Sequence, residues 1–133
     1  MYVLDTTTVS ALMRSEPIAA GRLLALGPAD VLIPQPVLAE VRDGLSRLPS
    51  SSRRRTLEGR LGTLLASVAR AAWTDDVSAR FGEAKAALEA RGERVDDMDV
   101  AIAAHALSLG ATLVTDNRKH FVRIPGLRVE SWR

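Results

Sequence analysis

Short apolar runs along the chain alternate with longer segments in which apolar residues recur every three or four positions. The short runs predict strands at residues 2–4, 31–33, 71–74, 112–115 and 128–131. The longer segments are typical of amphipathic helices and cover residues 9–13, 17–26, 37–48, 53–68, 77–91 and 99–109. This alternation predicts an α/β fold in which a central, mostly parallel sheet is flanked by helices on both faces. We expect residues 1–133 to form a single domain, because no linker, repeat or low-complexity segment interrupts the pattern.

Residues that favour helix caps mark the starts of several helices. Thr6–Thr8 precede the first helix, and we expect one of their hydroxyls to cap it. Asp75–Asp76 and Asp96–Asp97 stand before two later helices and are expected to act as caps there. Gly44 lies on the apolar side of its helix, which predicts a close approach of another backbone segment at that point.

Two helices carry a carboxylate on the side that their apolar residues predict to be buried. Glu40 shares a stripe with Val37 and Val41, and Asp99 shares one with Ile102. A buried carboxylate without a partner costs several kcal/mol. A proton or a cation is therefore expected to neutralise them. Taken alone, Asp99 could instead be a solvated acid in the first turn that favours the helix dipole.

Asp5 and Asp116 each stand just after a predicted strand. The carboxyl ends of parallel strands meet at one edge of the sheet, and the strand-to-helix connections bring Glu40 and Asp99 to that same edge. We therefore expect these four carboxylates to share one pocket. Oxygen ligands of this kind favour Mg²⁺ or Mn²⁺. Such an ion can activate a water molecule for attack on phosphorus, so the pattern favours phosphodiester hydrolysis.

The composition narrows the chemistry further. The chain has no cysteine, which excludes thiolate catalysis and cysteine-based zinc sites. Its two histidines are too few for a histidine-rich zinc site. His105 lies off the apolar stripe and is expected on a helix surface or at an interface. His120 could reach the acidic edge, although a loop position is the main expectation. Lys85 and Lys119 are the only lysines among 18 basic residues. Arginine suits phosphate binding, although a GC-rich genome would produce the same bias.

No apolar run reaches the length of a membrane span, and the first residues lack the pattern of a signal peptide. We therefore expect a cytoplasmic protein with no membrane partner. Aromatic residues make up only 4% of the chain, so a base-stacking platform for nucleic acid is not expected.

The residues that carry this chemistry fall in four segments. They are Val3–Thr6, Val37–Val41 with Gly44, Asp99–Ala106, and Leu113–Asn117 with His120 and Phe121. In this order and spacing, the chain resembles the PIN-domain ribonucleases, and among them the VapC-like toxins of bacterial type II toxin–antitoxin pairs. The resemblance extends to the segment Ile124–Trp132 and so covers nearly the whole length.

The resemblance implies a three-layer PIN-like fold and a Mg²⁺- or Mn²⁺-dependent endoribonuclease. Such an enzyme cleaves structured RNA (transfer, ribosomal or messenger), usually forms a homodimer and is silenced by a small cognate antitoxin. The catalytic, metal-binding acids of the family carry over onto Asp5, Glu40 and Asp99, which the stripe and strand-end arguments also select. For the fourth acid we expect Asp116, because it stands at a strand end, with Asn117 beside it. The family often places this acid one residue later, where this chain has Asn117.

Within this interpretation, each candidate residue has a role. Asp5, Asp99 and Asp116 would hold one or two ions against the scissile phosphate, and Glu40 would complete the metal site or orient the attacking water. Thr6, Asp97 and Asn117 are expected to support these ligands. Thr7 stands where the family commonly has asparagine. Five arginines are candidates for RNA contacts or for ordinary solvated charge: Arg14, Arg53, Arg54, Arg55 and Arg118.

Two other functions use a similar pattern. A receiver-like phosphoacceptor domain also collects aspartates around Mg²⁺, but it needs adjacent acids after the first strand, where Asp5 is followed by three threonines. It also needs a lysine after a late strand, and Lys119 is the only candidate. The other alternative is a catalytically weak PIN-fold module that binds or regulates together with a DNA-binding antitoxin. The presence of four acids argues against such a loss of catalysis.

Overall fold

The computed structural model describes residues 1–133 and contains one sheet of five strands, all parallel. The strands are β1 (Tyr2–Leu4), β2 (Val31–Pro34), β3 (Ala69–Ala71), β4 (Thr112–Val114) and β5 (Arg128–Glu130). Their order across the sheet is β3-β2-β1-β4-β5. The expected α/β architecture with a parallel sheet is confirmed, although β3 lies at 69–71 rather than at 71–74.

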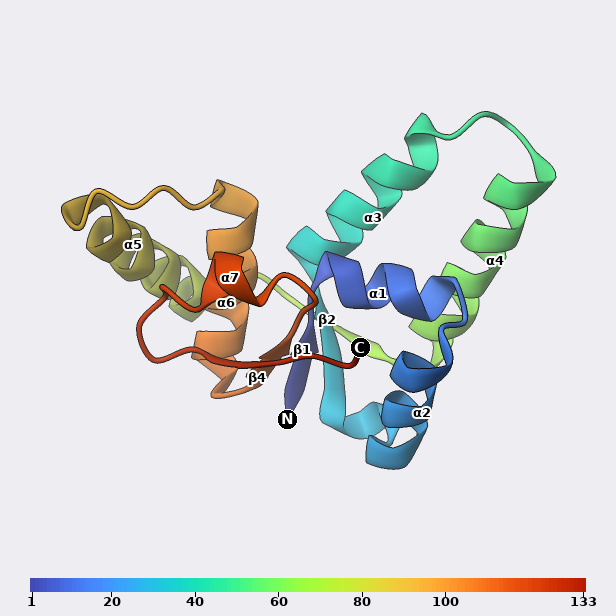
Figure 1. Cartoon of the computed structure of the whole chain (residues 1–133), viewed down its shortest axis with the longest axis horizontal. Helices are drawn as coiled ribbons and strands as arrows, with labels where there is room; N and C mark the ends of the chain where they lie inside the picture. The colour runs from blue at the N-terminus through green and yellow to red at the C-terminus, as the bar shows by residue number, and fades with distance from the viewer.

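Seven α-helices flank this sheet (Figure 1). They are α1 (Thr6–Met13), α2 (Pro17–Leu26), α3 (Gln35–Arg47), α4 (Ser52–Ser67), α5 (Asp75–Ala90), α6 (Asp97–Leu109) and α7 (Arg118–Phe121), and a short 3-10 helix, η1 (Pro28–Asp30), precedes β2. Figure 1 shows α5, α6 and α7 on one side of the strands and α1 to α4 on the other, where α3 and α4 project as a helical hairpin. No helix is long and apolar enough to cross a membrane.

The side on which the chain adds strands changes at β1, and this change determines which strand ends lie next to each other. After β1 the chain adds β2 and β3 on one side, and it then returns to add β4 and β5 on the other. The register pairs Leu4 of β1 with Val114 of β4, so the two strands end side by side. In open parallel sheets, ligands bind where the strand order reverses, outside the carboxyl ends of the strands. The residues that follow β1 and β4 are Asp5 and the Thr115–Asp116 pair.

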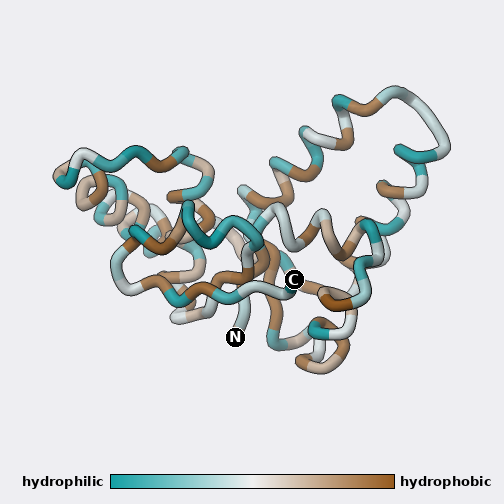
Figure 2. Tube along the Cα trace, viewed as in Figure 1, coloured by the Kyte–Doolittle hydropathy of each residue, from teal (hydrophilic) through white to brown (hydrophobic).

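The three central strands, β2, β1 and β4, are mostly apolar because helices cover both of their faces. Val3, Leu4, Ile33, Leu113 and Val114 are all 0% exposed, and the brown central strands of Figure 2 show this apolar centre. Parallel strands that are buried on both faces have continuous apolar sequences rather than alternating ones. The core therefore fixes the positions of the strand ends from which Asp5 and Asp116 follow.

Three of the local expectations about caps and close approach are wrong. The cap of α1 is Asp5, whose side chain accepts a hydrogen bond from the backbone of Thr8, so none of the threonines serves as its cap. The cap of α5 is Thr74, one residue before the aspartates expected to act there. Gly44 is exposed, and no atom lies within 4 Å of the position that a side chain would occupy. No neighbouring backbone therefore requires a glycine at this position.

His105 is fully buried, which corrects the expectation of a surface position. Every residue from Val100 to Ala106 of α6 is buried, because alanines allow α5 and the sheet to approach the helix on several sides. The Nδ1 of His105 lies 2.8 Å from the carbonyl of Ala101, and the ring meets Trp73 edge-on with 5.5 Å between centroids. Burial lowers the pKa of His105, and the bond to Ala101 offsets part of that effect. The imidazole is therefore an uncharged core side chain.

This buried imidazole predicts a loss of stability in acid. The unfolded chain takes up a proton near the ordinary histidine pKa of 6.5, whereas the folded chain resists it. The free energy of unfolding should therefore fall as the pH drops below that value. Urea unfolding across this range should show the fall in the wild type and a shallower one in His105→Gln. The exposed His120, changed to Gln, is the matched control and should leave the His105 contribution in place. Equal pH profiles with and without His105 would contradict the assignment.

Candidate active site

Asp5 is the most deeply placed acid at the β1–β4 edge, with 3% of its surface exposed. Its Oδ1 accepts hydrogen bonds from the backbone N–H of Thr8 at 2.9 Å and from the hydroxyl of Thr7 at 2.7 Å. Its Oδ2 accepts a short hydrogen bond from Thr115, the residue that follows β4. One carboxylate thus caps α1 and joins the ends of β1 and β4. A carboxylate offers about four acceptor positions, so Asp5 retains capacity for a further ligand.

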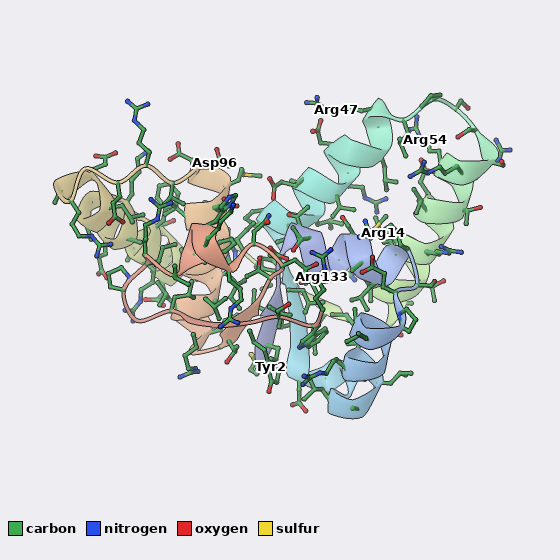
Figure 3. The ribbon with its side chains drawn as sticks, in the orientation of Figure 1. Tyr2, Arg14, Arg47, Arg54, Asp96 and Arg133 are labelled. Carbon is green, nitrogen blue, oxygen red and sulfur yellow. The ribbon has the colours of Figure 1, made fainter.

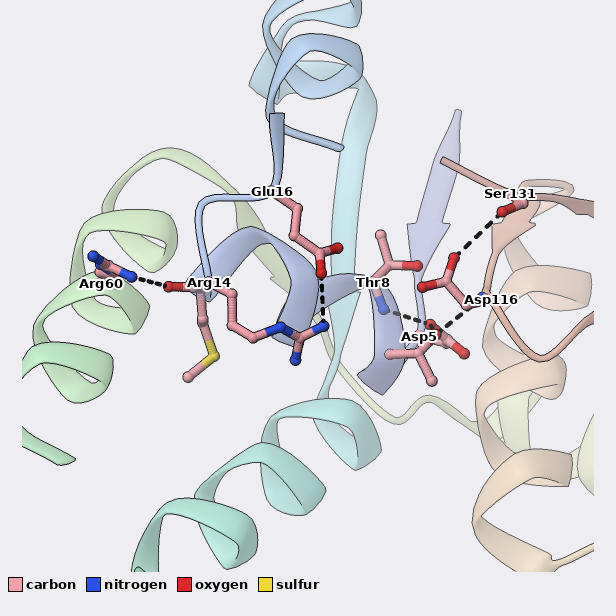
Figure 4. Close-up of polar contacts among 9 residues, drawn as sticks. Asp5, Thr8, Arg14, Glu16, Arg60, Asp116 and Ser131 are labelled. Atoms are coloured by element: carbon pink, nitrogen blue, oxygen red, sulfur yellow. Dashed lines mark hydrogen bonds and ion pairs between the residues drawn. The ribbon is translucent and has the colours of Figure 1, made fainter. Parts of the chain in front are cut away.

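Asp116 lies beside Asp5, and hydrogen bonds of Thr7 link the two residues. The backbone N–H of Asp116 donates to the Thr7 hydroxyl at 3.0 Å, and that hydroxyl donates to Asp5. Ser131, just after β5, donates to the Asp116 Oδ1 at 3.3 Å, and Figure 4 shows this contact next to Asp5. The two strand-end aspartates predicted from the sequence are therefore neighbours in space.

Glu40 reaches the same edge from the second turn of α3. The hydroxyl of Thr6 donates to the Glu40 Oε1 at 2.5 Å. Thr6 follows Asp5 directly, so this bond brings Glu40 next to the Asp5 segment. Two consecutive threonines therefore act on different acids, since Thr6 holds Glu40 and Thr7 links Asp5 to the backbone of Asp116.

Asp99, in the first turn of α6, is half-buried and surrounded by charge. Burial raises its pKa, the negative charges of Asp96 and Glu40 raise it further, and His120 acts in the opposite direction. The influence of Glu40 indicates that the α3 and α6 acids are electrostatic neighbours across the edge. The Nδ1 of His120 lies 3.4 Å from the Asp99 Oδ2. His120 belongs to the short helix α7, so the expectation of a loop position is wrong, and its ring contacts an acid of the edge.

Two other residues were expected to support the acids. Asp97 turns toward α5, and Asn117 acts through its backbone on Thr115, which donates to Asp5. Asp97 points to α5, where its Oδ1 meets the Lys85 ammonium at 2.8 Å. Asp96, labelled at the start of α6 in Figure 3, is the neighbouring acid that acts on Asp99. Asn117 is exposed, and its backbone N–H donates to the Thr115 hydroxyl at 2.9 Å.

Three contributors at this edge were not selected from the sequence: Thr115, Ser131 and Asp96. A single polar residue after a strand carries no distinguishing signal. The one usable sign was the Thr115–Asp116 pair that closes an apolar strand, which places a hydroxyl and a carboxylate at adjacent positions.

The donor set at this edge consists of hard oxygen atoms: carboxylates of Asp5, Glu40, Asp99 and Asp116, with threonine hydroxyls between them. Such donors fit Mg²⁺ or Mn²⁺ and do not fit a soft metal ion. Burial first, and then the negative charges of Asp96 and Glu40, raise the pKa of Asp99, so a nearby cation would stabilise its ionised form. No three carboxylate or histidine side chains are already spaced to hold one ion. Binding by three of these acids therefore requires side-chain rotation from these positions.

The strand order argues against the receiver-like alternative. Receiver domains have the order 2-1-3-4-5. Here β1 lies in the centre of the sheet, between β2 and β4, and β3 lies at the edge. The acids also come from four separate segments rather than from an adjacent pair after β1.

The family model of the PIN domain matches residues 2–127, and the chain belongs to this family. The chain is 31% identical over 134 residues to ribonuclease VapC2 of Rickettsia felis, with 99% of this chain and 98% of that protein covered. A shorter stretch of 51 residues is 45% identical to the tRNA(fMet)-specific endonuclease VapC of Salmonella typhimurium, covering 38% of this chain and 39% of that one.

Among solved structures, the fold is similar to VapBC2 from Rickettsia felis bound to a DNA fragment from its promoter. The TM-score is 0.89 at 30% identity, with 99% of this chain and 98% of that chain covered. The chain is thus a PIN-domain protein similar to the VapC toxins of toxin–antitoxin systems, as its sequence indicated.

The site predicts opposite effects on stability for two of its acids. In the absence of divalent ions, Asp99→Asn should leave the free energy of unfolding unchanged or raise it, because the ionised carboxylate is disfavoured where it lies. Asp5→Ala should lower it by about 1–3 kcal/mol, because α1 loses its cap and the Thr115 hydroxyl loses its acceptor. Urea unfolding in EDTA at neutral pH measures both changes.

Asp97→Asn serves as the control for this pair, because it removes one aspartate charge from an exposed ion pair. Its effect should stay within about 1 kcal/mol. A loss for Asp99→Asn as large as that for Asp5→Ala would show that Asp99 stabilises the fold, contrary to the prediction.

Proposed function

We propose that this protein is a Mg²⁺- or Mn²⁺-dependent endoribonuclease and the toxin of a toxin–antitoxin pair. One observation carries the proposal. Four acids from separate segments lie along one edge, where Thr6 and Thr7 connect three of them and the charge of Glu40 acts on the fourth. The relatives named as VapC ribonucleases and the VapBC complex with DNA support this function.

The four acids divide between two roles in this mechanism. Asp5, Asp99 and Asp116 would hold the ion, with Asp5 and Asp116 fixed at the ends of neighbouring strands. When bound, a divalent ion lowers the pKa of water and stabilises the charge that develops on the scissile phosphate. Glu40 completes the ligand set or accepts a proton from the attacking water, and the Thr6 hydroxyl orients its Oε1. His120 fixes the orientation of Asp99 through their contact.

The proposed partners follow from the same comparison. The similar structure from Rickettsia felis is a VapBC complex, so we assign to this chain a cognate antitoxin that silences it. We also assign a homodimeric state to the protein. The RNA substrate is a structured RNA, and transfer RNA is the substrate class that the name of the Salmonella typhimurium relative indicates.

The test is cleavage of RNA by purified protein. We expect the protein to cut bacterial transfer or ribosomal RNA in Mg²⁺ or Mn²⁺ and to be inactive in EDTA. Asp5→Asn, Glu40→Gln and Asp99→Asn should each lower kcat/KM by at least about a hundredfold, because each removes a charge expected to act on the reacting phosphate or water. Gel analysis of end-labelled RNA and sequencing of the new 5′ ends provide the measurement.

Asp97→Asn is the matched control for this assay, since Asp97 pairs with Lys85 rather than with Asp99. It should cleave as the wild type does. Wild-type protein that binds RNA and antitoxin but never cuts, with either ion, would favour the catalytically weak binding module instead.

A further inference from the structure

A groove lined by arginines leads away from Glu40 between α1, α3 and α4. It consists of two neighbouring hollows of about 240 Å³ and 380 Å³ that share lining residues. Thr6 and Glu40 line the first hollow, and Arg60 lines the second. Arg14 and Arg53 line both hollows and so mark where they meet. The groove therefore begins at an acid of the candidate site and continues along α4.

The arginines of this groove are largely free to bind an anion. Arg53 makes no hydrogen bond or ion pair within the chain. Arg14 pairs with Glu16 at 3.2 Å, but both side chains are about half exposed, so that pair is weak. Arg60 donates one hydrogen bond, from Nη1 to the carbonyl of Met13, and keeps its other donors (Figure 4). Glu40 is the only acidic residue that lines the groove.

Neighbouring arginines on α4 differ from those of the groove. Arg54, labelled in Figure 3, donates hydrogen bonds to Glu58 at 2.6 Å and to the carbonyl of Leu48 at 3.2 Å. Its guanidinium is therefore already paired within the chain. Arg55 lines neither hollow and has no partner. The structure thus separates arginines that the sequence could not tell apart.

The floor of the first hollow is apolar. Val41 and Leu45 are buried beneath it, and Met13, Leu48 and Leu57 complete it. An unpaired nucleotide presents an apolar face and a phosphate, and the phosphate prefers bidentate arginine donors at a rim. A paired strand hides its bases and could not use such a floor. This combination favours an unpaired RNA strand over a duplex.

We propose that this groove holds the backbone of an unpaired RNA strand and guides its scissile phosphate to the acids, with Arg14, Arg53 and Arg60 as positioning residues. The inference rests on the proposed ribonuclease function and names the route of the substrate to that site. A protein segment of the antitoxin is the competing occupant.

The first test measures binding in a protein that cannot cut. In an Asp99→Asn background, a labelled single-stranded RNA of about twelve nucleotides should bind about tenfold more weakly to Arg14→Gln/Arg53→Gln than to the parent. The slope of log K against log salt should fall in magnitude by about 1.4, because two phosphate contacts are lost. Arg94 is an exposed residue between α5 and α6 and, like Arg55, lines neither hollow. The matched control is therefore Arg55→Gln/Arg94→Gln, which removes the same charge outside the groove and should keep the slope.

The second test measures cleavage by enzyme that retains all four acids. The Arg14→Gln/Arg53→Gln variant should raise KM with little change in kcat, whereas a merely structural role would alter the unfolding curve instead. Arg60→Lys, which keeps the charge, should retain more affinity than Arg60→Gln.

The outcomes separate the two proposals. Cleavage by the wild type, with groove and control variants that bind and cut equally, would overturn the groove and leave the ribonuclease standing. Absence of cleavage with every RNA would overturn the ribonuclease, while the binding slopes would still test the groove. Loss of binding to the cognate antitoxin, with RNA binding unchanged, would assign the groove to the protein partner and overturn the inference.

Discussion

The carboxylate of Asp5 joins three elements at the point where the sheet reverses its strand order. It caps α1 and accepts hydrogen bonds from the hydroxyls of Thr115, at the end of β4, and Thr7. The Thr7 hydroxyl also accepts a hydrogen bond from the backbone N–H of Asp116. A site at this edge needs β1, α1 and β4 to meet in one arrangement, and the hydrogen bonds of a single buried side chain specify that arrangement. Folding and chemistry thus place demands on the same atoms, which is common where a polar network is buried.

The fold could be predicted from the sequence because its signals were local and agreed with one another. The runs Val31–Ile33 and Leu113–Val114, with helical periodicity between them, were sufficient for an α/β sheet. Asp5 and Asp116 could be found because each follows such a run. Glu40 and Asp99 could be found because a carboxylate interrupts an apolar stripe. These four positions lie along one edge, although their roles in binding a metal remain predictions.

The errors arose where tertiary packing decided the outcome. His105 lies off the stripe that includes Asp99 and Ile102, but α6 is enclosed on nearly all sides, so a stripe could not indicate its environment. His120 reaches Asp99 because the chain after β4 forms the short helix α7. Asp97 and Asp96 are adjacent in sequence, and only the position of Lys85 on α5 determines which of them turns away. Such information depends on which elements pack together and is absent from any single segment.

The pairing of β1 with β4 also has a consequence for biosynthesis. Asp5 and Thr115 meet although they are 110 positions apart, so the edge cannot assemble until Thr115 has left the ribosome. Domains fold as units during translation. A nascent chain therefore lacks the assembled pocket while it is still tethered beside ribosomal, transfer and messenger RNA. The pocket that the proposed ribonuclease needs therefore forms only after Thr115 is free to pair with Asp5.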